Sequence, residues 1–167
     1  PKVVVIYDDD FNYLTKMCLT RMREAAFRMS EIAKEFGCTV IVSGSDSVDH
    51  LEKYFTHKVD YAICGEGEQT LGELLDYLFA SKAKRVPSGS SHEDTHFARS
   101  EATKQSIHDI NGVAYIENGK ITRTAPRKVL KELDTLPYPA WELIDLTKYR
   151  ELWLKHHGYF SVNLVTT

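Results

Sequence analysis

Three short polar segments carry the residue types that could bind a ligand or a metal. They are Asp8-Asp9-Asp10, Ser43-Gly44-Ser45-Asp46 and Gly65-Glu66-Gly67-Glu68. Carboxylates suit Mg²⁺ binding or acid–base chemistry, and glycines let the backbone approach a ligand closely. Because Glu66 and Glu68 repel phosphate, and the spacing matches neither a dinucleotide-binding nor a Walker loop, the third segment favours a neutral, hydrogen-bonding ligand.

Each polar segment follows a short apolar run that reads as a buried strand, at residues 3–7, 38–44 and 60–64. A helical pattern follows each strand. The first has apolar positions at Leu14, Cys18, Met22, Ala26, Met29, Ala33 and Phe36 and ends at Gly37. This β-α order predicts an α/β fold with a Rossmann-like, three-layer parallel sheet. The carboxyl ends of parallel strands share one edge, where ligands bind, so all three polar segments are expected there.

The chain is expected to continue beyond this Rossmann-like part, residues 1–81, in three further sections. Residues 82–106 are polar without an apolar period and read as a flexible loop. Residues 107–125 alternate around Asn118-Gly119, which predicts a β-hairpin with a type I′ turn. Residues 126–167 hold prolines and closely spaced aromatics, which favours an extended connector. Because the chain begins and stops on apolar strands, we expect a piece of a longer protein, with one or two strands preceding Pro1.

Composition narrows the class of protein. The 167 residues carry 21 basic and 24 acidic side chains, a formal net charge of -3, which does not favour nucleic-acid or anionic-membrane partners. Three widely spaced cysteines, Cys18, Cys38 and Cys64, suit a reduced, cytoplasmic protein. No apolar run is long enough to cross a bilayer.

A catalytic centre does not emerge from residue spacing. His92 and His96 are four residues apart but lie in a segment without a helical pattern, so a solvated pair is favoured over a metal site. The Asp8–Asp10 cluster raises the alternative of a receiver-like phosphoacceptor domain, for which Asp46 is the acceptor candidate. That pattern also needs a Lys after a later strand, and no Lys directly follows the strand at 60–64.

Four stretches together resemble the cobalamin-binding domain found at the N-terminus of many radical S-adenosylmethionine enzymes. They are DYAICGEGEQTLGELLDYL, GVAYIENGKITRT, LDTLPYPAWELIDLTKY and FSVNLVTT, and the resemblance covers residues 1–167 in order. It implies a cobalamin-binding and positioning module that is not catalytic alone. By position, Ser43, Gly44, Ser45, Gly65, Glu66, Gly67 and Thr70 resemble the residues that line the cofactor's nucleotide tail.

The resemblance also implies a radical S-adenosylmethionine barrel after Thr167 in the same chain. That barrel would hold a 4Fe-4S cluster and S-adenosylmethionine through a C-x-x-x-C-x-x-C motif, which this sequence lacks. The sequence also lacks Asp-x-His-x-x-Gly, whose His binds cobalt in some relatives of the family. The alternative is a Rossmann-like scaffold that binds no cofactor and packs on the catalytic barrel.

Overall fold

The computed structural model describes residues 1–7, 18–83, 106–138 and 140–161. The chain divides into two compact units, Pro1–Leu130 and Lys131–Thr167. The predicted features at Asp8–Asp10, at His92 and His96, and at residues 162–167 lie outside the described residues.

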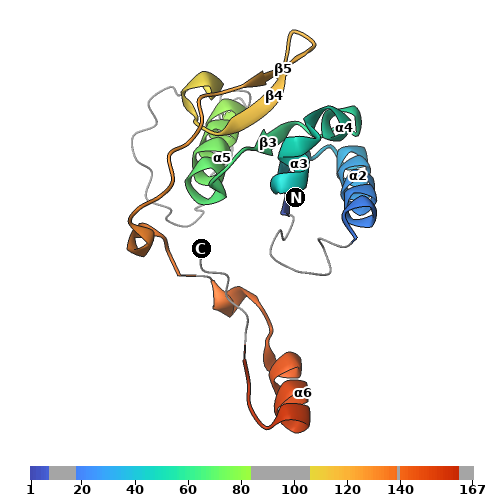
Figure 1. The fold of residues 1–167 in the computed structure, drawn as a ribbon, viewed down its shortest axis with the longest axis vertical. Helices are drawn as coiled ribbons and strands as arrows, with labels where there is room; N and C mark the ends of the chain where they lie inside the picture. The colour runs from blue at the N-terminus through green and yellow to red at the C-terminus, as the bar shows by residue number, and fades with distance from the viewer. Residues whose placement is uncertain (8–17, 84–105, 139, 162–167) are drawn as a thin grey trace. The chain divides into compact units, whose positions relative to one another are not determined.

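A five-stranded sheet forms the centre of the first unit (Figure 1). Its strands are β1 (Val3–Tyr7), β2 (Thr39–Ser43), β3 (Tyr61–Ile63), β4 (Val113–Glu117) and β5 (Lys120–Arg123), and they lie in this order across the sheet. The pairs β1–β2 and β2–β3 are parallel, whereas β3–β4 and β4–β5 are antiparallel. The α/β, Rossmann-like prediction is confirmed, and the hairpin extends the same sheet.

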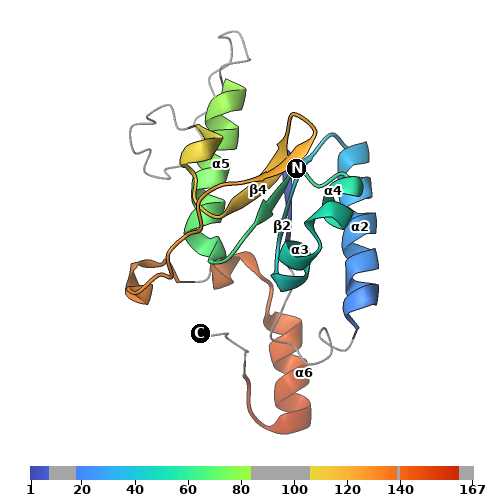
Figure 2. The same cartoon turned by 45° about the horizontal axis from the view of Figure 1, so that its top comes forward.

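Helices cover both faces of this sheet, which gives three layers (Figures 1 and 2). They are α2 (Leu19–Glu35), α3 (Ser45–Asp49), α4 (Leu51–Thr56) and α5 (Gly67–Ala83). Val40 and Val42 of β2 point into the core shared with α2 and α4, and the alternate residue Ile41 points into the core shared with α5. Strands buried on both faces explain the continuous apolar runs in the sequence.

Only part of the apolar series predicted for the helix α2 is buried against the sheet. Ser30 and Ala33 are buried, whereas Met22 and Met29 are exposed. The buried Ser30 hydroxyl donates to the backbone oxygen of His57 at 2.8 Å, a bond that the sequence does not reveal. Of the predicted apolar positions, Ala26 and Ala33 thus pack in the core, whereas Met22, Met29 and Phe36 do not.

The hairpin turn has the backbone that its sequence predicts. Asn118 and Gly119 both have positive φ, at 51° and 75°, as a type I′ turn requires. The apolar start of β4 is fully buried, with Val113 and Ala114 at most 1% exposed. Its burial against β3 places the hairpin within the sheet.

The second unit contains short helical turns η2 (Leu133–Thr135) and η3 (Trp141–Leu143) and the helix α6 (Thr147–His157). The predicted extended connector is therefore partly helical. Aromatic rings pack along α6, with the Trp153 and His157 ring centres 4.3 Å apart. In the described part of the chain, no helix is both long and apolar enough to cross a membrane.

Candidate functional site

The carboxyl ends of the three parallel strands lie level with one another. Tyr7 is in register with Ser43, and Ser43 is in register with Ile63. The residues that follow β2 and β3 therefore leave the sheet side by side, toward the starts of α3 and α5 (Figure 2). This is the edge at which open α/β sheets bind ligands.

Gly67 brings the start of α5 against the ends of β1 and β2. A Cβ built on Gly67 would lie 3.5 Å from the Ser43 hydroxyl oxygen and 3.9 Å from a ring carbon of Tyr7. The residues predicted at this edge after β2 and β3 thus meet in the structure. The Ser43 side chain is buried at this contact, with the residue only 5% exposed.

Two further glycines at this edge have backbone conformations that other residues rarely adopt. Gly44, directly after β2, has φ of 145°, and Gly65, after β3, has φ of 92°. A Cβ on Gly65 would meet no atom within 4 Å, so open space lies beside the backbone there. Glycine is needed here for the turn, and its small size leaves room above the strand ends.

The serines after β2 differ in their surroundings. Ser45 is the first residue of α3. It is exposed to solvent and also interacts with another group of the protein. Ser47 is buried, and its hydroxyl donates to the backbone oxygen of Gly44 at 2.8 Å. The Ser47 bond fixes the turn, whereas the Ser45 side chain stands at the surface of the edge.

Thr70 fastens the Gly-Glu-Gly-Glu segment to the rest of the sheet. It is fully buried, and its hydroxyl lies 3.0 Å from the backbone oxygen of Glu66 and 3.1 Å from that of Asn111. The Arg127 Nε donates to the same hydroxyl at 2.7 Å. Arg127 also pairs with Glu73, so this hydroxyl belongs to a network that ties α5 to the segment after β5.

Arg127 could not be predicted as a partner of Thr70, because it lies in an irregular segment 57 residues further along the chain. The side chain of Glu66 is half-buried beside this network. Among the residues predicted to line a cofactor, Thr70 therefore makes its hydrogen bonds within the protein. Ser45 and Gly65 are exposed to solvent.

A buried ion pair lies just beyond the same edge. The Arg23 guanidinium donates to both carboxylate oxygens of Asp46, at 2.7 and 2.5 Å, and the Tyr54 hydroxyl donates to Asp46 at 2.9 Å. The Arg23 hydrogen bonds hold the pKa of Asp46 below its ordinary value, against the effect of burial. Both oxygens of the receiver-like acceptor candidate are therefore engaged. The sequence patterns did not identify Arg23 and Tyr54 as partners of Asp46, although Arg23 lies on the same helix face as Ala26 and Ser30.

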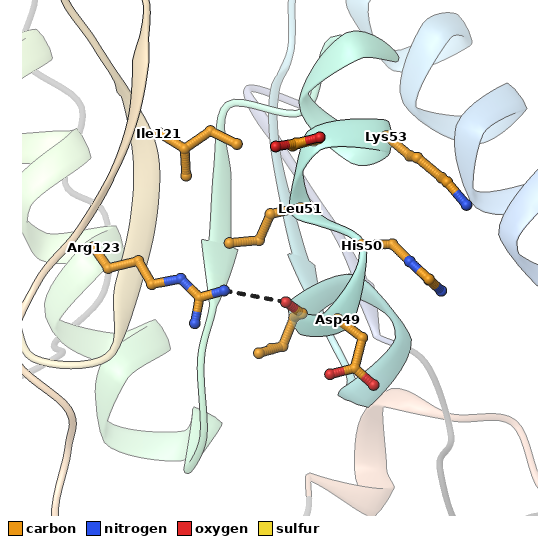
Figure 3. A pocket seen from close by; sticks show the side chains of 8 residues that line it. Asp49, His50, Leu51, Lys53, Ile121 and Arg123 are labelled. Atoms are coloured by element: carbon orange, nitrogen blue, oxygen red, sulfur yellow. Dashed lines mark hydrogen bonds between the residues drawn. The ribbon is translucent and has the colours of Figure 1, made fainter.

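A cavity of about 350 Å³ lies away from this edge, between α4 and β5 (Figure 3). Leu51 and Ile121 form an apolar side, and Arg123 donates to the backbone oxygen of Val48 at 3.3 Å. Its charged groups do not converge, since the side chains of His50 and Lys53 point away from Arg123 in Figure 3. The cavity therefore lacks a set of polar groups aimed at one ligand.

No metal-binding cluster is present among the residues described. His57 lies 3.0 Å from Glu31, and His108 lies 3.0 Å from the hydroxyl of Tyr115, so both take part in structural hydrogen bonds. The Cys64 thiol, directly after β3, has a pKa raised by burial. A protonated thiol is a poor metal ligand and nucleophile.

The fold and the edge residues together define an α/β protein with a Rossmann-like sheet and a glycine- and serine-lined carboxyl edge. The chain is similar to an uncharacterized methyltransferase of Pyrococcus horikoshii, with 26% identity over 153 residues. The match covers 89% of this chain and 28% of that protein, so the chain spans less than a third of the relative's length. No protein-family model matches the sequence, and no solved structure matches it.

Proposed function

We propose that the chain is a cobalamin-binding and positioning module of a larger radical S-adenosylmethionine enzyme. The observation that carries the proposal is the meeting of Ser43 and Gly67 at the carboxyl edge of the parallel strands, with open space beside Gly65. The similarity to a methyltransferase supports methyl transfer as the reaction of the whole enzyme.

The residues at the edge fit the nucleotide tail of cobalamin. The tail is bulky and rich in hydroxyl and amide groups, so it needs space and hydrogen-bonding partners more than it needs charge. The Cβ positions at Gly65 and Gly67 are open or in ordinary contact, and a side chain there would occupy the space above the strand ends. Ser45 offers an exposed hydroxyl, and Glu66 offers a carboxylate acceptor.

In this proposal the chain's own residues bind and orient the cofactor. Gly44, Gly65 and Gly67 allow close approach, Ser45 supplies a hydroxyl at the surface above the buried Ser43, and Thr70 holds the loop in place through Arg127. Cobalamin, when bound, supplies methyl-carrying cobalt chemistry. The 167 residues contain no Asp-x-His-x-x-Gly string, so within this chain the proposal assigns no His to the cobalt. The 4Fe-4S cluster and S-adenosylmethionine would belong to a barrel elsewhere in the polypeptide, which would be the domain's partner.

The test is a titration of the chain with hydroxocobalamin, read by its visible absorption spectrum and by the melting temperature of the protein. Gly67→Leu places a side chain against Ser43 and Tyr7, and Gly72→Leu makes the same change on the exposed side of α5, where a Cβ meets nothing within 4 Å. We expect binding by the unchanged chain and by Gly72→Leu, and at least tenfold weaker binding by Gly67→Leu. Equal binding by both variants would place the cofactor elsewhere.

The scaffold alternative is favoured by one observation, the Thr70 network. Arg127, Thr70 and the Glu66 backbone form a set of bonds that gives the segment a structural role without any ligand. If the unchanged chain produces no spectral shift and no stabilisation with hydroxocobalamin, the scaffold reading replaces the cofactor-binding one.

A further inference from the structure

An apolar stripe runs along the exposed side of α2 and the residues that flank it. Its members are Cys18, Met22, Ala25, Met29, Ile32 and Phe36, spaced by four, three, four, three and four residues. All six are exposed, and Met29 and Phe36 are 50% and 78% exposed. Alternating spacings of three and four are the pattern by which one helix packs lengthwise against another.

The stripe lies on the opposite side of α2 from α4. Phe27 of α2 packs against Tyr54 of α4, with ring centres 5.0 Å apart, and Glu31 contacts His57. At 3.6 residues per turn, Phe27 and Glu31 lie across the helix from the stripe. Since α2 covers β1 and β2, the stripe borders the side of the sheet on which β1 is the last strand.

In the part of the chain that the structure describes, β1 has an unpaired edge on the same side. Among the described residues, β1 pairs with β2 alone. The backbone oxygen of Lys2 accepts from Thr39 of β2 at 3.0 Å, so the alternate residues Val3 and Val5 direct their backbone groups away from β2. An edge of this kind can pair with a further strand.

We propose that the α2 stripe and the β1 edge form one interface that binds a second copy of this chain in a two-fold symmetric dimer. A two-fold axis perpendicular to the sheet would make the two β1 strands antiparallel and, at the same time, the two α2 helices antiparallel. The two sheets would become one continuous sheet, with the helix pair across its centre.

The charges beside the stripe fit an antiparallel pair of copies. Arg21, Arg28 and Glu35 directly precede the apolar residues Met22, Met29 and Phe36. In an antiparallel heptad-type pair these flanking positions face one another, so Arg21 meets Glu35 of the second copy at both ends of the interface.

Arg28 lies at the centre of this pairing and meets its own counterpart. Glu31, 3.6 Å from Arg28 in the same helix, partly offsets that repulsion. A parallel pair would oppose Arg21 to Ala26 and Arg28 to Ala33, without any charge pairing. The flanking charges therefore favour the antiparallel arrangement that the two-fold axis requires.

Sedimentation and light scattering of the 167-residue chain test the proposal. We expect a mass twice the 19.1 kDa of one chain at micromolar concentration. Met29→Lys should give monomers, whereas Val129→Lys, which charges an exposed apolar side chain outside the stripe, should leave the dimer intact. A monomer at high concentration, or a dimer that tolerates Met29→Lys, overturns the proposal and leaves the stripe to another part of the polypeptide.

A charge exchange distinguishes a second copy from any other partner. Arg21→Glu or Glu35→Arg alone opposes like charges at both ends, and we expect self-association about 10- to 30-fold weaker. Mixing the two variants restores opposite charges in the mixed pair, so dimers should reappear on mixing. The combined variant R21E/E35R should also dimerise. A mixture that associates no better than its separate components would contradict the antiparallel pairing.

Discussion

Removing the Asp46 carboxylate should destabilise the first unit strongly, because it leaves a buried arginine without its partner. The side chains of Arg23 and Asp46 are 15% and 4% exposed, and the carboxylate accepts from both Arg23 and the Tyr54 hydroxyl. Breaking a buried ion pair by deleting one partner costs about 3–5 kcal/mol. Since Arg23 retains some contact with water, we expect Asp46→Ala to lower the free energy of unfolding by about 3 kcal/mol.

Urea denaturation followed by circular dichroism at 222 nm measures this change. Tryptophan fluorescence is unsuitable, because Trp141 and Trp153 both lie in the second unit. The control is Glu24→Ala, which removes the partner of Arg21 in a pair whose side chains are 86% and 58% exposed, and which should cost less than about 0.5 kcal/mol. A loss below about 1 kcal/mol for Asp46→Ala would refute the view that this pair holds α2 to α3.

The same carboxylate makes the free energy of unfolding depend on pH in the acidic range. The pKa of Asp46 is lowered in the folded state, first by the Arg23 hydrogen bonds, from an ordinary value of 3.8. Between the lowered folded pKa and the ordinary value of 3.8, the folded protein therefore binds fewer protons than the unfolded chain. The stabilisation is fully present once the pH is about one unit above 3.8. It is lost as the pH falls through the lowered folded pKa. Asp46→Asn should flatten this acid dependence in urea titrations; an unchanged dependence would assign it to other carboxylates.

Two further changes test the contacts that place the candidate site. Thr70→Val removes the buried hydroxyl that accepts from Arg127, and should lower the free energy of unfolding by about 1–3 kcal/mol, whereas Thr56→Val, at an exposed hydroxyl, should cost less than about 0.5 kcal/mol. Similar losses in urea titrations would show that the Arg127 network is unimportant. Gly119→Ala places a Cβ at φ of 75° and should cost about 1 kcal/mol, measured as a lower melting temperature, while Asn118→Gly in the same turn should be close to neutral. An alanine variant as stable as the original would mean that the turn readily changes type.

The local elements could be predicted from the sequence, because the signals for them are local. Continuous apolar runs predicted β1, β2 and β3, and Asn118-Gly119 predicted the hairpin turn. The alternation of strands and helices then placed the segments after β2 and β3 at one edge, as the contact between Gly67 and Ser43 shows. The resemblance to cobalamin-binding domains added a function that local patterns alone could not supply, and it stays a prediction.

Which side of α2 is buried, and which partners the polar residues have, depends on how distant elements pack together. Ser30 faces inward, where its hydroxyl donates to the backbone oxygen of His57, and Met29 faces outward. Arg127 reaches Thr70 across 57 residues of chain. Such pairings depend on how distant elements dock, and a hydrogen bond between distant residues leaves no periodic trace in the sequence. Apolar spacing reports that a helix has an apolar stripe, but the stripe can serve the core or, as we propose for α2, a second copy of the chain.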